Sequence, residues 1–237
     1  MSDALTLAIE TSNPGSASAA SVFGAALADG AGQVLGCVAL KPRSRHDDAL
    51  MPAVERLCRE QGVGPGAIGR VAVSAGPGGY TSIRIAVTTA KILGEATGAA
   101  CIGVPTTLAV HENLPGDIRS RPVTICLAWK REDVWQVNYD ESHPAWQNTE
   151  GRLTRIDDLR VPTGGVLVAD RAFLDSAAGR GLLPGVETCE AVFHPVGVIR
   201  AAAWCDAVSP EALLPLYPRE PEAVTKWEAL KRRDAGG

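Results

Sequence analysis

The residues best suited to chemistry are a glycine-rich loop and two carboxylates. Gly-Pro-Gly-Gly-Tyr-Thr at 76–81 follows the apolar run 71–75 and precedes a long helical pattern. Backbone N–H groups and the dipole at a helix N-terminus attract anions such as phosphate. Glu10 and Asp170 each end an apolar run, as phosphate- or magnesium-binding carboxylates do in folds of the sugar-kinase type. The candidate contacts of such an anion or nucleotide site are Glu10, Gly76, Gly78, Gly79, Thr81 and Asp170.

The glycine loop lacks the residues of the specific phosphate-binding motifs. It has no Gly-Lys-Ser/Thr of a P-loop, and Thr81 stands where a dinucleotide-binding fingerprint needs its third small residue. A tight turn from strand to helix also requires glycines, for their backbone angles alone. The loop by itself favours this structural role over an anion site.

The histidines and hydroxyl groups show no catalytic or metal-binding pattern. Leu50 stands four residues after His46, and Pro115 four residues after His111, where a helical metal pair would need its second ligand. No nucleophile-elbow motif surrounds a serine or cysteine. We therefore predict no catalytic residue and no metal site, and interpret all four histidines as surface or structural residues. They are His46, His111, His143 and His194.

The six cysteines are scattered singly, and no pair has Cys-x-x-Cys spacing. This pattern indicates reduced, buried thiols in a cytoplasmic protein rather than zinc ligands or disulfides. The cysteines are Cys37, Cys58, Cys101, Cys126, Cys189 and Cys205.

The composition is that of a globular protein with a core of small aliphatic side chains. Of 237 residues, 46% are hydrophobic but only 5% aromatic. The net charge of −4 excludes a globally basic nucleic-acid binder. No apolar run reaches the ~18 residues of a membrane span, and the first residues lack the basic region of a signal peptide. We predict a cytoplasmic location and no membrane partner.

The period of the apolar pattern predicts the elements that position these residues. In the first half we predict strands at 5–9, 18–27, 34–40, 71–75 and 100–104, and helices at 48–59, 81–97 and 106–113. In the second half we predict a hairpin of strands 123–127 and 134–139, a strand at 166–170, and helices at 172–178 and 198–208.

Both halves begin with strands and then alternate strand and helix. This order favours an α/β architecture with mixed sheets, built as a pseudo-duplication of one α/β unit. The segment 114–117, Leu-Pro-Gly-Asp, looks like a boundary. We therefore divide the chain into an N-terminal half, 1–115, and a C-terminal half, 116–237.

The predicted helix 81–97 has an unusually wide apolar face. Its polar residues form one narrow stripe, and the rest of its circumference is apolar or small, although a helix lying on a sheet needs only ~100° of apolar arc. Either this helix is buried between the sheet and the helix 48–59, or part of it packs against another protein chain. The polar stripe consists of Arg84, Thr88, Lys91 and Glu95.

The charged tail ends in Lys-Arg-Arg at 231–233. A run of this kind is most often a solvated helix end, and an RNA contact is the less favoured alternative.

Several segments together resemble the TsaB (YeaZ) family, and the match is dense over the first half. Leu-Ala-Ile-Glu-Thr-Ser at 7–12, Arg-His-Asp-Asp-Ala-Leu-Met-Pro at 45–52 and the glycine loop with its helix, 75–85, carry the likeness. Gly-Val-Pro-Thr-Thr-Leu at 103–108 and Pro-Leu-Tyr-Pro-Arg at 215–219 fit the family in order and place.

The resemblance implies an actin/hexokinase-like (ASKHA) fold of two related α/β halves and an accessory role without chemistry of its own. Members of this family bind the catalytic subunit TsaD, which acts with the ATPase TsaE to transfer a threonylcarbamoyl group to adenosine 37 of tRNA. The chain would then touch tRNA only indirectly and leave ATP and Mg to its partners. Because exposed apolar helices tend to pair, we also predict a homodimer in isolation. The implied interface lies on the helices 48–59 and 81–97, with Leu50, Met51, Val54, Leu57, Ile83, Ile85, Val87 and Ile92.

The sequence also departs from the family pattern. Glu10 replaces the usual aspartate, a glycine is missing after Thr81, Ala-Trp-Lys-Arg at 128–131 replaces Asp-Ala-Arg-Arg, and Arg171 would crowd a phosphate. These departures argue against nucleotide binding by this chain. The alternative function is that of an independent enzyme, either an ASKHA-type ATPase or kinase or a peptidase-like protein.

Overall fold

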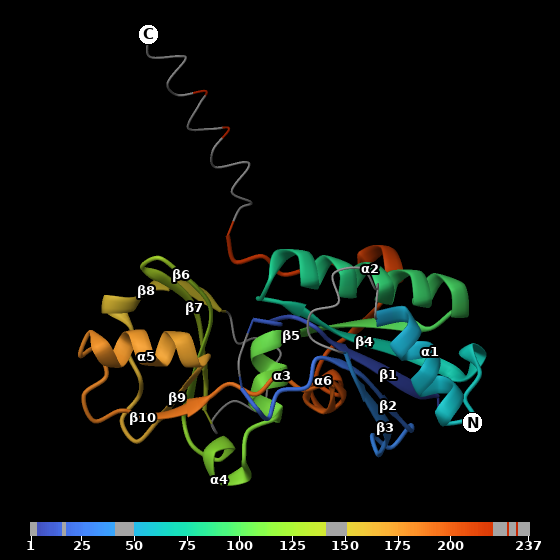
Figure 1. The fold of residues 1–237 in the computed structure, drawn as a ribbon, viewed down its shortest axis with the longest axis horizontal. Helices are drawn as coiled ribbons and strands as arrows, with labels where there is room; N and C mark the ends of the chain where they lie inside the picture. The colour runs from blue at the N-terminus through green and yellow to red at the C-terminus, as the bar shows by residue number, and fades with distance from the viewer. Residues whose placement is uncertain are drawn as a thin grey trace.

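The computed structural model describes residues 4–15, 18–40, 50–140 and 151–219, together with Trp227 and Lys231. These residues form two lobes, each built on one β-sheet (Figure 1). The strands of the first lobe are β1 (Leu5–Glu10), β2 (Gly24–Ala28), β3 (Val34–Ala39), β4 (Ile68–Gly76), β5 (Ala100–Pro105) and β11 (Ala207–Val208). Those of the second are β6 (Val123–Lys130), β7 (Asp133–Tyr139), β8 (Arg152–Arg155), β9 (Val166–Ala169) and β10 (Glu187–Glu190).

Helices cover the outer faces and fill the space between the lobes. The α-helices are α1 (Leu50–Glu60), α2 (Tyr80–Thr97), α3 (Thr106–Glu112), α4 (Gly116–Arg119), α5 (Arg171–Gly179) and α6 (Pro195–Ala202). The described residues also include the short 3-10 turns η1 (Pro65–Ala67), η3 (Ile156–Asp158) and η4 (Pro210–Ala212). No helix of the described residues is long and apolar enough to span a membrane.

The two sheets share one strand order, which confirms the predicted α/β class and the duplication. The first sheet runs β11-β5-β4-β1-β2-β3 and the second β10-β9-β6-β7-β8. In each lobe the first strand pairs antiparallel with the second and parallel with the fourth. The helices α2 and α5 therefore occupy equivalent places, since each follows the fourth strand of its lobe.

The end of the chain returns to the first lobe. The helix α6 packs on α3 and on the first sheet, between the lobes (Figure 1). After it, β11 pairs with β5 and adds an edge strand to the first sheet. The predicted half 116–237 is therefore not one contiguous unit of structure. We call residues 207–219 the C-terminal strap.

Three clusters of apolar side chains form the core. Along β1, Leu7 and Ile9 point to the face covered by α1 and α2, while Ala8 points to the face covered by α6. Successive residues of a strand face opposite sides of its sheet, so this alternation gives the first sheet two buried faces. A third cluster lies beneath α5 in the second lobe.

The predicted helix 198–208 is wrong at both ends. The helix α6 begins at Pro195, where the imidazole of His194 accepts the Val196 N–H at 3.1 Å, and it ends at Ala202. Proline at the first helical position and a side-chain cap together mark this start. The predicted strand 18–27 begins only at Gly24 in the structure. The predicted helix start at residue 48 lies outside the described residues.

Candidate functional site

A groove along α2, bordered by Met51 of α1, lies on the surface of the first lobe. Both helices pack on the same face of the first sheet and contribute to one hydrophobic cluster. The groove has a volume of about 450 Å³. It is lined by Met51, Thr81, Arg84, Ile85, Thr88, Thr89 and Ile92. A mixed apolar and polar groove between two helices suits a helical or extended segment of another protein.

The structure divides the eight predicted interface residues into two groups. Three are exposed and line the groove: Met51 (40%), Ile85 (47%) and Ile92 (59%). The other five are buried in the chain's own core, so they support the groove from below and offer no surface to a partner. They are Leu50, Val54, Leu57, Ile83 and Val87.

The broad apolar face of α2 is only partly buried by the chain's own fold. One part, including Ile83, is buried on the sheet, while Ile85 and Ile92 remain exposed. The polar stripe is also divided. The ammonium group of Lys91 donates to the carbonyls of Glu211 and Leu213 in the strap, at 3.1 and 3.3 Å.

The glycine loop after β4 is filled by the chain's own backbone. A side chain on Gly76 would collide with the carbonyl oxygen of Leu216, and one on Gly78 with the carbonyl oxygen of Ser12. The Gly79 N–H donates to this same Ser12 oxygen at 2.6 Å. These contacts explain why Gly76 and Gly78 are glycines. They also bond the Gly79 N–H to the chain itself, so this group is not available to an anion. The geometry therefore favours the tight turn, and Thr81 lies exposed at the start of α2, in the groove.

Glu10 is a fully buried carboxylate at the end of β1, next to this loop. Its Oε1 atom accepts the Ser12 N–H at 2.7 Å, and its Oε2 atom has no hydrogen-bond partner among the described residues. Burial raises the pKa of Glu10, and the hydrogen bond from Ser12 opposes this effect only in part. Ser12 thus links the carboxylate to the glycine loop, a role that sequence reasoning did not assign to it.

Asp170 has a structural role in the second lobe. Its Oδ1 atom accepts the Phe173 N–H at 2.9 Å and caps α5. The neighbouring Arg171 pairs with Glu190 at 2.8 Å. Asp170 lies at the position equivalent to the glycine loop, after the fourth strand, and not at the position equivalent to Glu10. The predicted site residues therefore fall in two places, with Glu10 and the glycine loop together and Asp170 in the other lobe.

The described histidines have structural environments. His111 is fully buried in α3, with its ring centroid 4.8 Å from that of Tyr139. His194 caps α6, and burial lowers its pKa. His46 and His143 lie outside the described residues. Within the ranges that the structure covers, no group of three or more His, Cys, Asp or Glu side chains can hold a metal; that the chain needs no metal stays a prediction.

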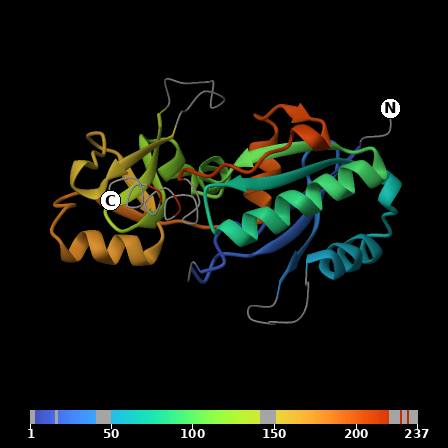
Figure 2. The ribbon, with the colours of Figure 1, turned by 90° about the horizontal axis from the view of Figure 1, so that it is seen from above.

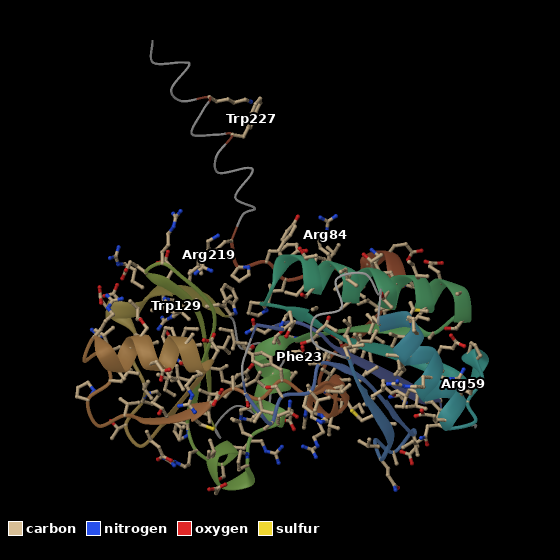
Figure 3. All side chains as sticks on the ribbon, viewed as in Figure 1. Phe23, Arg59, Arg84, Trp129, Arg219 and Trp227 are labelled. Atoms are coloured by element: carbon tan, nitrogen blue, oxygen red, sulfur yellow. The ribbon has the colours of Figure 1, made fainter. Side chains whose placement is uncertain are left out.

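All six cysteines are free, as predicted, but only Cys101 and Cys126 are buried. Cys37 is exposed because it lies on β3, at the edge of the first sheet. In the charged tail, the ammonium of Lys231 lies 5.1 Å from the ring centroid of Trp227, and both residues are exposed. Figure 3 shows Trp227 well away from the two lobes. Arg232 and Arg233 lie outside the described residues.

Two lobes of equal strand order, with a helix from each packed between them, define an actin/hexokinase-like α/β fold. The sequence model of the family "TsaD: tRNA N6-adenosine threonylcarbamoyltransferase" matches residues 33–164, more than half of the chain. The chain therefore belongs to the TsaD family.

Solved structures support this assignment at the level of the fold. YeaZ from Pseudomonas aeruginosa superimposes with a TM-score of 0.70 at 19% identity, over 92% of this chain and all of that one. A second structure, described as an uncharacterized protein with similarity to peptidase YEAZ from Pseudomonas aeruginosa, gives the same TM-score and coverage at 20% identity. The fold is thus that of YeaZ.

A curated relative from Mycobacterium leprae, the uncharacterized protein ML0378, is 28% identical over 155 residues. The alignment covers 65% of this chain but only 38% of the length of that protein.

Proposed function

We propose that this chain is an accessory subunit of tRNA threonylcarbamoyladenosine synthesis and binds a TsaD-type catalytic subunit through the α1–α2 groove. Membership of the TsaD family supports a role related to this modification. The observation that carries the proposal is the exposure of Met51, Ile85 and Ile92 along one groove. Such a role belongs in the cytoplasm, where tRNA is modified.

The groove suits a protein partner because its helices are fixed from below. Leu57 and Ile83 are fully buried, so α1 and α2 form a rigid base. Ile85 and Ile92 are about half exposed, so burying the rest of each side chain against a partner would release roughly half of the ~1.5–3 kcal/mol gained by full burial. Arg84 and Thr88 add a polar edge that can select the partner.

In this proposal the chain itself catalyses no covalent step. Backbone atoms fill the glycine loop, and Asp170 caps a helix. In this proposal ATP and Mg are handled by the catalytic subunit and a TsaE-like ATPase, and tRNA meets this chain through the complex.

Titration of the purified TsaD-type subunit with this chain tests the interface. Ile92→Asp is expected to weaken binding by at least 30-fold, because it places a charge in the groove. Leu153→Asp is the matched control, since Leu153 is 43% exposed on β8 in the other lobe, and wild-type affinity is expected.

Reconstituted threonylcarbamoylation with and without this chain tests the role. We expect activity to depend on the chain and to fall with Ile92→Asp. Wild-type binding by Ile92→Asp contradicts the interface, and full activity without the chain contradicts the function.

A second candidate function, an ASKHA-type ATPase or kinase, is favoured by one observation. The Oε2 atom of Glu10 is buried beside the glycine loop and has no hydrogen-bond partner among the residues that the structure describes. Calorimetry with Mg-ATP separates the two functions. Tight binding with turnover, both lost in Glu10→Gln, favours the enzyme, whereas the accessory role predicts no binding heat.

A further inference from the structure

The C-terminal strap runs from the first lobe, where η4 contacts α2, to the β6–β7 hairpin of the second lobe (Figure 2). Its strand β11 pairs with β5, and further along, the Leu216 N–H donates to the Ala75 carbonyl at 2.7 Å. At its end, the guanidinium of Arg219 donates to the carbonyls of Ala128 and Asp133, at 2.6 and 2.7 Å, in the β6–β7 hairpin. Figure 3 shows Arg219 on the same side of the molecule as Arg84 of α2.

The strap is held against α2 at two places. Lys91 bonds to two strap carbonyls, and the ring of Tyr217 lies 4.8 Å from the ring of Tyr80. The guanidinium of Arg84 lies over the same Tyr80 ring, at 5.3 Å. These contacts keep the strap in one conformation, so little entropy would be lost when another protein binds it.

Two strap leucines face solvent although the strap is fixed. Leu213 is buried in the core, but its neighbour Leu214 is 70% exposed and Leu216 is 36% exposed. The strap lies on the side of α2 away from α1, since β11 pairs with β5 and η4 contacts α2, whereas α1 covers β2 and β3. Lys91, which holds the strap, and Ile92, which lines the groove, are consecutive residues and so point about 100° apart on the helix.

The described part of the groove is smaller than the surface that a stable complex uses. Seven described residues line it, whereas a stable interface uses about 20–30 residues on each side. The docking surface must therefore extend past the groove, and the strap continues it on the far flank of α2 with exposed apolar side chains.

We propose that the TsaD-type partner straddles α2, with one apolar element in the groove and a second against Leu214 and Leu216 of the strap. An acidic side chain of the partner then faces Arg84, which stands between the two contacts. This inference rests on the proposed function for the identity of the partner, and it adds the strap to the surface that the partner recognises.

The test is the affinity of the full-length chain for the purified TsaD-type subunit, measured by calorimetry. Leu214→Asp is expected to weaken binding at least tenfold. Its melting temperature is expected to stay near that of the wild type, because Leu214 is mostly exposed. Leu153→Asp again serves as the matched control, with unchanged affinity.

Ile92→Asp separates the failure of this inference from that of the proposed function. If Ile92→Asp binds weakly and Leu214→Asp binds as tightly as the wild type, the partner does not straddle α2 and only the strap contact is overturned. If both variants bind as tightly as the wild type, the proposed interface itself is wrong. A loss for Leu214→Asp with a retained fold supports the strap contact.

Discussion

The carbonyl oxygen of Leu216 occupies the space in which a side chain on Gly76 would lie. Gly76 also has a φ of +120°, which residues with a side chain rarely adopt. The glycine that looks from the sequence like part of a phosphate loop therefore allows the strap to pass close to the end of β4. A side chain at position 76 should therefore lower the stability of the fold, whether or not a ligand binds the loop.

Gly76→Ala is expected to destabilise the protein by about 2–4 kcal/mol, because it combines backbone strain with a collision. For a chain of this length that corresponds to a decrease in melting temperature of roughly 5–15 °C. Gly66→Ala is the matched control, since nothing lies within 4 Å of the added methyl group. Equal melting temperatures for the two variants would show that the strap does not need the space at Gly76.

Replacing Glu10 by Gln should change the pH dependence of stability. Because burial raises the pKa of Glu10, the folded state binds its proton more tightly than the unfolded chain. The wild type then has its full stability below the ordinary pKa of 4.5 and loses stability as pH rises through the raised value. Each unit of the shift corresponds to about 1.4 kcal/mol.

Urea unfolding at pH 5 and pH 8 measures this effect. The amide in Glu10→Gln cannot ionise but can still accept the Ser12 N–H. The midpoint of the variant, relative to the wild type, is therefore expected to increase from pH 5 to pH 8. A constant difference between the two proteins would mean that Glu10 does not titrate in this range.

Arg219→Ala should loosen the strap. The variant loses two hydrogen bonds to carbonyls in the second lobe, each worth about 1–2 kcal/mol. Hydrogen exchange of the Leu216 amide, which is bonded to Ala75, is expected to become at least tenfold faster. Arg59→Ala removes only an exposed ion pair of α1 and should leave this amide protected. Unchanged exchange in Arg219→Ala would show that the strap is held without its last anchor.

The chain is expected to self-associate through the groove when its partner is absent, since exposed apolar helices tend to pair. Light scattering at increasing concentration should show a dimer for the wild type and for Leu153→Asp. Ile85→Asp should remain monomeric, because Ile85 is exposed in the middle of the groove. A monomeric wild type at high concentration excludes this association.

The sequence predicted best the parts of the fold that are buried on both faces. Unbroken apolar runs at β4 and β9 identified central strands, and the period of three to four residues identified α1 and α2. The edge strands β8, β10 and β11 were missed. They are short, and β8 and β10 are rich in charged residues. They become strands because each pairs with a neighbouring strand. That neighbour is distant in sequence, so the local sequence pattern does not reveal the pairing.

The sequence predicted the residue types of the candidate site. It did not predict which of these residues are buried in the core and which are exposed on the surface. Ile83 and Ile85 are the same residue type on one helix, yet one is fully buried and the other exposed. Their side chains point about 200° apart around the helix, so the position of the sheet under α2 decides which of them is buried. The segment 215–219 resembles the family in sequence, but its contacts with Gly76 and Tyr80 join residues far apart in the chain.

The return of α6 and β11 to the first sheet affects how the protein is made. During synthesis on the ribosome, the N-terminal half emerges first but lacks one edge strand and the helix that covers one of its faces. That half completes its structure only when the last quarter of the chain has been translated. A nascent chain arrested before residue 195 should therefore need chaperone protection of the uncovered alanine-rich face of its sheet.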